Sequence, residues 1–185
     1  MPPSPPILAV GGAAGSGKST LADAVAVALR VPVVRLDDCY HTDPGVAPSL
    51  PRYDGPGRVV DFSDPDAIDL GRVRAAVAAV AGADLIIVEG IFALTLDAVR
   101  AAARWTIFVD TPPDVSIARK TLRKIGEGRD AGLVLRGYLE HGRAAYVRHI
   151  APAGRRAGLI LDGTRSTTAL CAEVCQHLQT RLPPA

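Results

Sequence analysis

The segment GGAAGSGKST, at positions 11–20, directly follows the apolar run Ile7–Val10 and constrains the fold of this chain more than any other feature. Glycines let the backbone turn sharply, so that successive N–H groups can point at one anion. The helix expected at Ser19–Arg30 would add the positive end of its dipole at the same place. A strand, a glycine-rich turn and a helix in this order form a cradle for a phosphate group.

The spacing within this segment makes the prediction more specific. Gly12 to Ser19 satisfies G-x-x-x-x-G-K-[ST], the P-loop pattern, in which Lys18 reaches the β- and γ-phosphates and the Ser19 hydroxyl can bind Mg²⁺. A flexible loop that matches by chance is the alternative, but the strand before the segment and the helix after it favour a nucleotide site with Mg²⁺. The expected nucleotide-binding residues are Gly12, Ala13, Ala14, Gly15, Ser16, Gly17, Lys18, Ser19 and Thr20.

The identity of the nucleotide follows from a missing residue type. The chain contains no asparagine, so it lacks the N-K-x-D element with which GTPases usually recognise guanine. ATP is therefore the expected cofactor, and a kinase or another ATPase is the expected class. A small-molecule kinase further needs a carboxylate that accepts the substrate hydroxyl's proton, a group near Mg²⁺, and mobile cations over the transferred phosphoryl group.

Two acidic residues that follow predicted strands are candidates for these roles. Asp37 comes at the carboxyl end of the run Val33–Leu36, an edge that faces the ligand crevice in open α/β sheets. It is the expected catalytic base, with a turn-capping aspartate as the alternative. Glu89 ends the core run Leu85–Val88 and is expected to organise Mg²⁺ together with Ser19, with a helix or turn cap as the alternative.

Cations gather in the segment Arg119–Asp130, which we call the lid segment. Lys120 and Arg123 are three residues apart and would share one face of a helix that leads into a glycine-flanked turn with Arg129. A solvent-exposed basic helix is one interpretation. The other is a short lid that closes its cations onto the phosphates and excludes water. With the lid, the expected catalytic residues are Asp37, Lys18, Arg123 and Arg129.

Short apolar runs alternate with alanine-rich helical stretches along the whole chain, which favours a parallel sheet with right-handed crossovers. The expected strands are Ile7–Val10, Val33–Leu36, Leu85–Val88, Thr106–Val109 and Leu159–Leu161. The expected helices are Ser19–Arg30, Pro65–Val80, Thr95–Ala103, Pro113–Ile125, Ala131–His149 and Ser166–Leu182. The segment His41–Val60 is irregular, and long loops in such folds are more often functional than idle. We expect an α/β P-loop NTPase three-layer sandwich, with a five-stranded parallel sheet, helices on both faces and a short lid.

Length and composition narrow the class of protein. At 185 residues the chain suits one domain, 1–185. A net charge of +2 without a basic block argues against nucleic acid or a membrane surface as the main partner, so a small molecule is the expected partner and a homo-oligomer is left open. The N-terminal segment MPPSPP has neither the positive charge nor the long apolar core of a signal peptide. An odd number of cysteines, three, is typical of a protein in a reducing cytosol, so a cytoplasmic protein is expected.

Taken together, these segments resemble the uridine kinase family of P-loop kinases, which is grouped with phosphoribulokinase and bacterial pantothenate kinase. The matching segments, which span nearly the whole chain, are GGAAGSGKST, Leu36–Tyr40 (family D-x-F-Y), Asp61–Ala67 (N/D-[FW]-D-H-P-D-A), Ile87–Leu94 (VEGIFAL), Phe108–Thr111 (F-V-D-T) and Arg119–Asp130 (lid). The resemblance implies a sheet of order 2-3-1-4-5, Asp37 as base, and phosphoryl transfer from Mg-ATP to a nucleoside 5′-OH. The expected substrate-binding residues are Asp37, Tyr40, Tyr53, Phe62, Asp64, Lys120 and Arg129.

The sequence departs from the family pattern mainly where an acceptor would bind. Ser63 stands where the family has the aspartate that binds the ribose hydroxyls. The family carries a hairpin with P-x-Y-D before the VEG strand, whereas Gly71–Ala83 here contains no aromatic residue. We therefore expect uridine to be at best a poor substrate. The alternatives are a kinase of another metabolite, such as a vitamin precursor or a sugar, and an ATP-binding regulatory protein without turnover.

Overall fold

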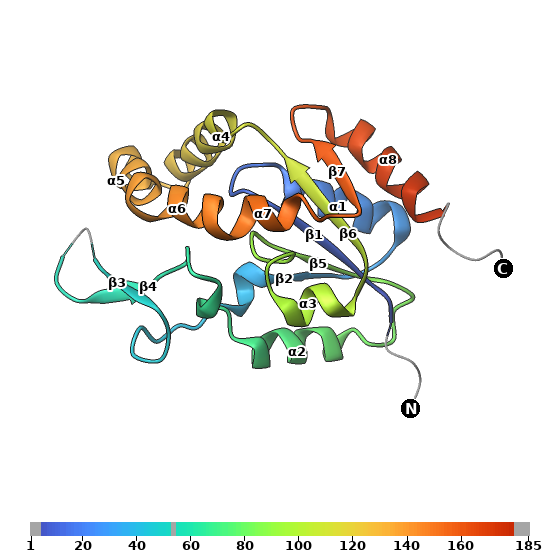
Figure 1. Cartoon of the computed structure of the whole chain (residues 1–185), viewed down its shortest axis with the longest axis horizontal. Helices are drawn as coiled ribbons and strands as arrows, with labels where there is room; N and C mark the ends of the chain where they lie inside the picture. The colour runs from blue at the N-terminus through green and yellow to red at the C-terminus, as the bar shows by residue number, and fades with distance from the viewer. Residues whose placement is uncertain (1–4, 53–54, 180–185) are drawn as a thin grey trace.

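A five-stranded parallel sheet forms the centre of the computed structural model, which describes residues 5–52 and 55–179 (Figure 1). Its strands are β1 (Ile7–Gly12), β2 (Val33–Arg35), β5 (Ile86–Glu89), β6 (Ala103–Asp110) and β7 (Leu159–Asp162). They lie in the order β2-β5-β1-β6-β7, and all neighbours are parallel. Counted along the chain within this sheet, that is the predicted order 2-3-1-4-5, so the predicted fold is confirmed.

Helices cover both faces of the sheet (Figure 1). One core contains Leu8 and Val10 of β1 and side chains of α1 (Lys18–Leu29) and α8 (Thr167–Gln179). The other core contains the alternate β1 residues Ile7 and Ala9 and side chains of the remaining covering helices, which are α2 (Leu70–Ala79), α3 (Asp97–Ala102) and α7 (Ala151–Gly154). Alternate residues of a strand point to opposite faces, and full burial of one such leucine contributes roughly 1.5–3 kcal/mol. The two cores give the predicted three layers.

The region 65–80 is not one helix, as the sequence pattern suggested. A 3₁₀ turn at Pro65–Ala67 precedes α2, which begins only after Asp69. The Asp64 carboxylate accepts the N–H of Asp66 and caps the turn, and the Asp69 carboxylate accepts two N–H groups at the start of α2. Two separate side-chain caps therefore divide the segment, since each one satisfies N–H groups that lack a helical partner.

The segment His41–Val60, predicted to be irregular, contains a small antiparallel sheet. Its strands are β3 (Ser49–Pro51) and β4 (Arg58–Val60), and the Arg58 guanidinium also donates to the Ser49 side chain. Figure 1 shows this hairpin projecting from the main sheet, below α5 (Ala131–Gly137). Tyr53, one of the predicted substrate-binding residues, lies outside the described residues.

The helix predicted at Ala131–His149 is irregular and continues further along the chain. After α5 come a π-helical segment at Tyr138–Gly142, α6 (Arg143–Ala145), a second π-helical segment at Tyr146–Ile150, and α7. The prediction ended this helix before Pro152, but Pro152 lies in the first turn of α7, where a residue without N–H is tolerated. None of the helices in the described ranges is long and apolar enough to cross a membrane.

Candidate active site

The glycine-rich loop between β1 and α1 is tightly packed. Gly15 and Gly17 have φ angles of +90° and +96°, which side-chain-bearing residues rarely adopt. A Cβ on Gly15 would lie 2.1 Å from the carbonyl oxygen of Ser116 in α4 (Pro113–Gly126). The Ser16 N–H donates to the Ala13 carbonyl at 3.0 Å and closes the turn. Both glycines are therefore required by the backbone conformation, and Gly15 also by the close approach of α4.

Two polar side chains of the loop are buried at the start of α1. Lys18 is 6 % exposed and Ser16 is fully buried. The Ser16 carbonyl accepts the Thr111 hydroxyl at 2.9 Å, whereas the Ser16 hydroxyl has no hydrogen-bond partner among the described residues. A buried hydroxyl left without a partner costs about 1–3 kcal/mol. A buried lysine and an unsatisfied hydroxyl beside a helix N-terminus fit a bound phosphate.

Glu89, the predicted magnesium-side carboxylate, lies beside the loop and is 2 % exposed. Ser19 Oγ donates to Glu89 Oε2 at 3.2 Å, and Arg35 Nη1 donates to Glu89 Oε1 at 3.2 Å. Arg35 stands next to Glu89 because β2 and β5 are paired in that register. Its hydrogen bond to Asp23 and its proximity to Asp23 and Glu89 raise the pKa of the Arg35 guanidinium.

The pair Ser19 and Glu89 offers one hydroxyl oxygen and one carboxylate to a cation. A hydroxyl and a carboxylate are the hard oxygen ligands that Mg²⁺ prefers, and this ion is usually held by one or two protein groups together with substrate phosphates. A cluster of three or more His, Cys, Asp or Glu residues that could enclose a metal is absent from the described part of the chain. The arrangement thus fits an ion shared with a nucleotide.

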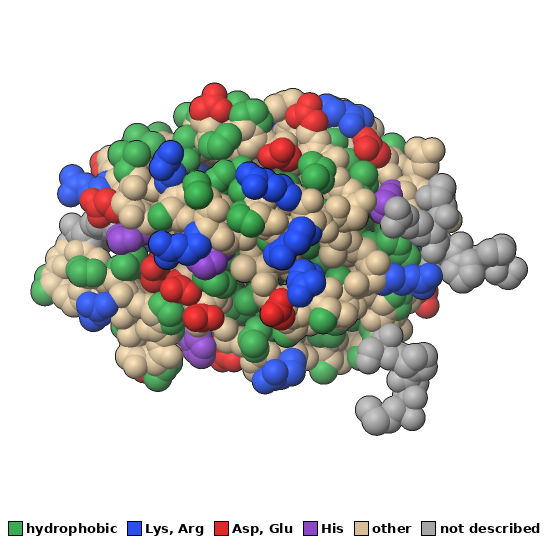
Figure 2. Space-filling model, viewed as in Figure 1, with side chains coloured by type: hydrophobic (Ala, Val, Ile, Leu, Met, Phe, Trp, Pro, Cys, Tyr) green, Lys and Arg blue, Asp and Glu red, His purple; other side chains and the backbone are tan. Residues whose placement is uncertain are grey.

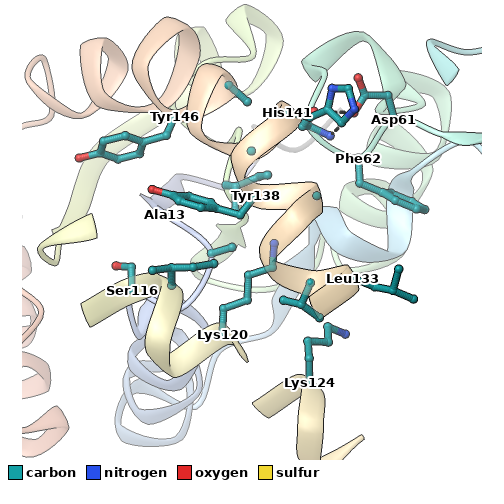
Figure 3. Close-up of a pocket in the computed structure, with 18 of the residues that line it drawn as sticks. Ala13, Asp61, Phe62, Ser116, Lys120, Lys124, Leu133, Tyr138, His141 and Tyr146 are labelled. Carbon is teal, nitrogen blue, oxygen red and sulfur yellow. Dashed lines mark hydrogen bonds between the residues drawn. The ribbon is translucent and has the colours of Figure 1, made fainter. Parts of the chain in front are cut away.

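A cavity of ≈ 430 Å³, which we call the lid cavity, opens on the phosphate loop (Figure 3). Ala13 and Ala14 form its floor at the loop. Its walls come from α4 with the lid segment, from the helical stretch 130–150, and from the hairpin region after β3, and it includes Ile91 after β5. Segments far apart in the sequence therefore build one pocket beside the phosphate cradle, which is the usual form of a small-molecule site.

Every fourth residue of the helical stretch lines this cavity. The row consists of Asp130, Val134, Tyr138, Gly142, Tyr146 and Ile150. At 3.6 residues per turn, a spacing of four would drift by about 40° per step around an α-helix. The π-helical segments Tyr138–Gly142 and Tyr146–Ile150 contain wider turns, so they return the row to the cavity side. The irregular helix is therefore what keeps one wall of the cavity straight.

Cations line the end of the cavity near the phosphate loop. Lys120, Lys124 and Arg129 all contribute to the lining, and Figure 3 shows the Lys120 side chain directed into the space. Burial lowers the pKa of Lys120, and the nearby positive charges of Lys124, Arg123 and Lys18 lower it further. Arg123 itself does not line the cavity, and its guanidinium lies 3.7 Å from the Glu127 carboxylate. Mutually repelling cations at this place favour an anionic ligand.

Asp37 lies in the turn after β2, two residues beyond the end of the strand, and is exposed. It lines a second cavity of ≈ 600 Å³, the Asp37 cavity, together with Tyr40 and Arg72. Val59, Val60 and Phe62 line both cavities, so a thin wall separates them. Asp37 and Arg129, which the sequence placed around one acceptor, thus face two adjoining spaces.

Phe62, which belongs to that wall, packs against Tyr40 of the Asp37 cavity. Their rings meet edge to face with centroids 4.9 Å apart, and the Tyr40 hydroxyl donates to the Phe62 carbonyl at 3.2 Å. Tyr40 is 7 % exposed, whereas Phe62 is 57 % exposed. Burial raises the pKa of the Tyr40 phenol, and the carboxylates of Asp37 and Asp61 raise it further. Tyr40 is therefore placed to hold the Phe62 loop as a neutral phenol.

Asp64, predicted to bind substrate, caps the Pro65–Ala67 turn and is outside the linings of both cavities. Four residues that line the lid cavity, Asp61, Tyr138, His141 and Tyr146, had not been predicted as site residues. The sequence did not show which side of the helical stretch would face the cavity, so it carried little signal for the last three. Asp61 begins the Asp61–Ala67 segment, in which Asp64 matched the expectation of a carboxylate equally well.

Residues 72–169 match the profile of the PRK family, described as the Phosphoribulokinase / Uridine kinase family. The chain belongs to this family. The predicted resemblance is thus confirmed, and the matched region contains Glu89, the lid segment and most of the helical wall.

Two curated relatives illustrate the similarity. The chain is 29 % identical over 208 residues to Uridine kinase-like protein 4 of Arabidopsis thaliana, covering 96 % of this chain and 43 % of that protein. It is 28 % identical over 183 residues to uridine kinase of Escherichia coli K12, covering 84 % of this chain and 85 % of that protein. The chain therefore spans less than half of the plant relative and most of the bacterial one.

Among solved structures, APS kinase of Mycobacterium tuberculosis is similar with a TM-score of 0.59 and 22 % identity, covering 96 % of this chain and 99 % of that one. This likeness shows a shared P-loop kinase fold. The family match and the shared fold therefore agree with each other.

Proposed function

We propose that this protein transfers the γ-phosphoryl group of ATP to a hydroxyl of a small molecule, most directly the 5′-OH of a nucleoside. The observation that carries the proposal is a small-molecule-sized cavity that opens on the phosphate loop and has cations at that end. Relatives named uridine kinase support the nucleoside, although at identities below 30 %.

Residues of the phosphate loop bind and orient the nucleotide in this proposal. The loop N–H groups and Lys18 hold the β- and γ-phosphates, and the positive end of α1 adds to their attraction. Ser19 and Glu89 would hold Mg²⁺, which supplies charge neutralisation at the phosphates when bound. Arg35 donates to Glu89 Oε1 and so holds the carboxylate with its other oxygen turned toward Ser19.

The acceptor end needs one proton transfer. Asp37 accepts the proton of the attacking hydroxyl, since its carboxylate is exposed and faces the space next to the lid cavity. Lys120 and Arg129 neutralise the charge that spreads over the transferred phosphoryl oxygens. The lid segment excludes water from this charge when it closes. The hydroxyl would have to lie within reach of both the phosphate loop and Asp37, with the rest of the acceptor in the lid cavity.

The acceptor side is the part of the site at which the sequence departs most from the family pattern. Ser63 and the aromatic-free stretch Gly71–Ala83 are the observations that favour an acceptor other than uridine. The letters P-x-Y-D do occur in the chain, at Pro51–Asp54, between β3 and β4 instead of before β5. The hairpin that bears Pro51 also supplies Leu50 and Val59 to the lid cavity. These features are compatible with a nucleoside that is bound differently, and with a metabolite that is not a nucleoside.

A coupled ADP-release assay tests the proposal. Mg-ATP would be offered with a panel of nucleosides, sugars and small alcohols, and acceptor-dependent ADP release is expected for at least one of them. Release without any acceptor would indicate a simple ATPase. Tight ATP binding with no release from any member of a broad panel would favour a regulatory protein and overturn the proposed transfer reaction.

A further inference from the structure

The end of the lid cavity away from the lid cations is built around one carboxylate. Asp61 follows β4 and lines the cavity. Its N–H donates to the Pro48 carbonyl at 2.7 Å. One carboxylate oxygen, Oδ1, accepts both the N–H of Ser63 at 2.9 Å and the Ser63 hydroxyl at 2.5 Å. The loop therefore fixes the Asp61 side chain in place before any ligand binds.

His141 joins Asp61 at this end from a different part of the chain. It belongs to the first π-helical segment, lines the cavity, and Figure 3 shows its ring beside Asp61. Its Nε2 lies 3.9 Å from the Glu140 carboxylate. Position 141 comes seven residues after Val134, which also lines the cavity, so the two residues lie within about 20° of each other around a helix. The helical stretch therefore presents the imidazole on its cavity side.

The two ends of the cavity are chemically opposite. Lys120 contributes positive charge near the phosphate loop, whereas Asp61 contributes negative charge at the other end. The lining also includes apolar side chains such as Ile91 and Leu133. A ligand whose reacting hydroxyl approaches the phosphate loop would therefore place its remote end at Asp61 and His141.

We infer that Asp61 and His141 are specificity-determining residues that bind the remote end of the acceptor, and that this end carries N–H or O–H donors and no negative charge. This inference rests on the proposed function. An ionised carboxylate accepts hydrogen bonds from donors and repels anions. A site that is built to bind such a donor discriminates strongly against an analogue that lacks it, since its buried polar groups are then left unpaired.

A neighbouring carboxylate provides the contrast. Asp64 belongs to the same D-F-S-D segment, but it accepts the N–H of Asp66 and lies outside the lining of the lid cavity. The structure thus assigns the acceptor-binding role to Asp61 and a capping role to Asp64. Substitution of the two residues by asparagine is the matched comparison, because each change removes one charge and preserves size.

The experiment uses the full chain with a non-hydrolysable ATP analogue and a panel of nucleosides. The panel contains uridine, cytidine, adenosine and guanosine, an N-methylated analogue of each base that has a ring N–H, and orotidine as a carboxylated nucleoside. Calorimetry measures binding, and ADP release from Mg-ATP measures turnover. Asp61→Asn is expected to weaken binding of the best neutral nucleoside by about tenfold to a hundredfold. The substitution should raise the KM for the nucleoside, and the affinity for the nucleotide should remain unchanged.

The discrimination pattern separates recognition from a merely structural role. In Asp61→Asn the preference for a neutral nucleoside over orotidine should shrink, and methylation of the base should matter less than in the wild type. Asp64→Asn should keep the wild-type order of preference. His141→Gln, at a partly exposed position, provides a second variant in case Asp61→Asn does not fold, and it should also lower acceptor affinity.

Each outcome bears on the inference. Acceptor affinity and preferences within about twofold of wild type in both Asp61→Asn and His141→Gln would overturn it and leave the phosphotransfer proposal intact. Nucleoside binding that depends on Asp61, without turnover, would support it and contradict only the transfer reaction. If no panel member binds the wild type, the inference and the nucleoside acceptor are both wrong, and ADP release with sugars or alcohols would show whether a kinase remains.

Discussion

The phosphate loop and the lid cavity meet at Ala13 and Ala14, but they are constructed in different ways. The loop is one continuous segment in which Gly15 is confined by α4 and the side chains of Ser16 and Lys18 are buried. The cavity is assembled from a hairpin, a cationic helix and an irregular helix that come from distant parts of the chain. The difference suggests that nucleotide binding tolerates little change, whereas acceptor choice can vary while the fold is preserved.

In Figure 2 the visible face carries acidic, basic and histidine side chains mixed together, without one broad patch of a single charge. The loop needs no such surface because its positive potential comes from backbone N–H groups, the helix dipole and Lys18. The acceptor side depends instead on individual side chains. A substitution in the phosphate loop should therefore leave acceptor binding unchanged, and a substitution on the acceptor side should leave ATP binding unchanged.

The largest effect is expected from Lys18→Ala. Removing the buried ammonium takes away the side chain that reaches the β- and γ-phosphates, so most Mg-ATP binding measured by calorimetry should be lost. Lys18→Arg, which keeps the charge, serves as the comparison, and a thermal melt checks folding. A folded Lys18→Ala protein with unchanged ATP affinity would refute the loop assignment.

Asp37→Asn should act on the other side of the site. The substitution keeps the size and removes the proton acceptor, so turnover should fall by about 10²–10⁴. ATP affinity should stay nearly intact, because Asp37 lines the Asp37 cavity and lies outside the phosphate loop. The neighbouring Asp38→Asn, in the same cavity, is the control and should retain most activity. Wild-type turnover in Asp37→Asn would exclude it as the base.

A third prediction compares acceptors instead of variants. Because Ser63 stands in place of a ribose-binding carboxylate and Gly71–Ala83 lacks aromatic residues, uridine should be a poorer substrate than the best member of the panel. The measurement is the ratio of their kcat/KM values. A kcat/KM for uridine or cytidine of about 10⁴ M⁻¹s⁻¹ or more, the range of efficient enzymes, would contradict this interpretation.

Glu89→Gln is expected to change the magnesium requirement by several-fold. The amide cannot supply the negative charge that favours Mg²⁺ beside Ser19, so a higher Mg²⁺ concentration should be needed for nucleotide binding. Asp23→Asn is the control, since it removes a carboxylate from Arg35 without touching Ser19. If the Mg²⁺ titrations of Glu89→Gln and wild type coincide, Glu89 has a purely structural role.

The smallest effect should come from Gly142→Ala in the cavity wall. A Cβ at this position would lie 3.3 Å from the Tyr138 ring, so the ring must shift slightly into the cavity. Alanine in a helical position stabilises by up to about 1 kcal/mol relative to glycine. We expect a higher melting temperature together with a modest rise in acceptor KM of roughly twofold to fivefold, about 0.4–1 kcal/mol. A changed ATP KM would show that the two sides are less separate than described.

Much of the fold and of the nucleotide side could be read from the sequence. The strands, their order and the phosphate loop depend on local features: apolar runs, a glycine pattern and a helix after it. The boundaries of α2 were less predictable, because two aspartate caps compete within a few residues of each other. The hairpin of β3 and β4 was missed since its strands are short and lie in a segment rich in proline and glycine.

The sequence alone determined the family, the sheet order and the loop that binds the nucleotide, because these follow from contiguous patterns in which each residue's neighbours along the chain supply the chemistry. Tertiary structure decided which carboxylate lines the cavity, Asp61 and not Asp64, and which helical side chains join it. That choice depends on one capping hydrogen bond and on two π-helical segments that shift the helical period. Neither has a signature in a periodic sequence pattern, since both arise from competition for the same backbone groups once the chain is packed.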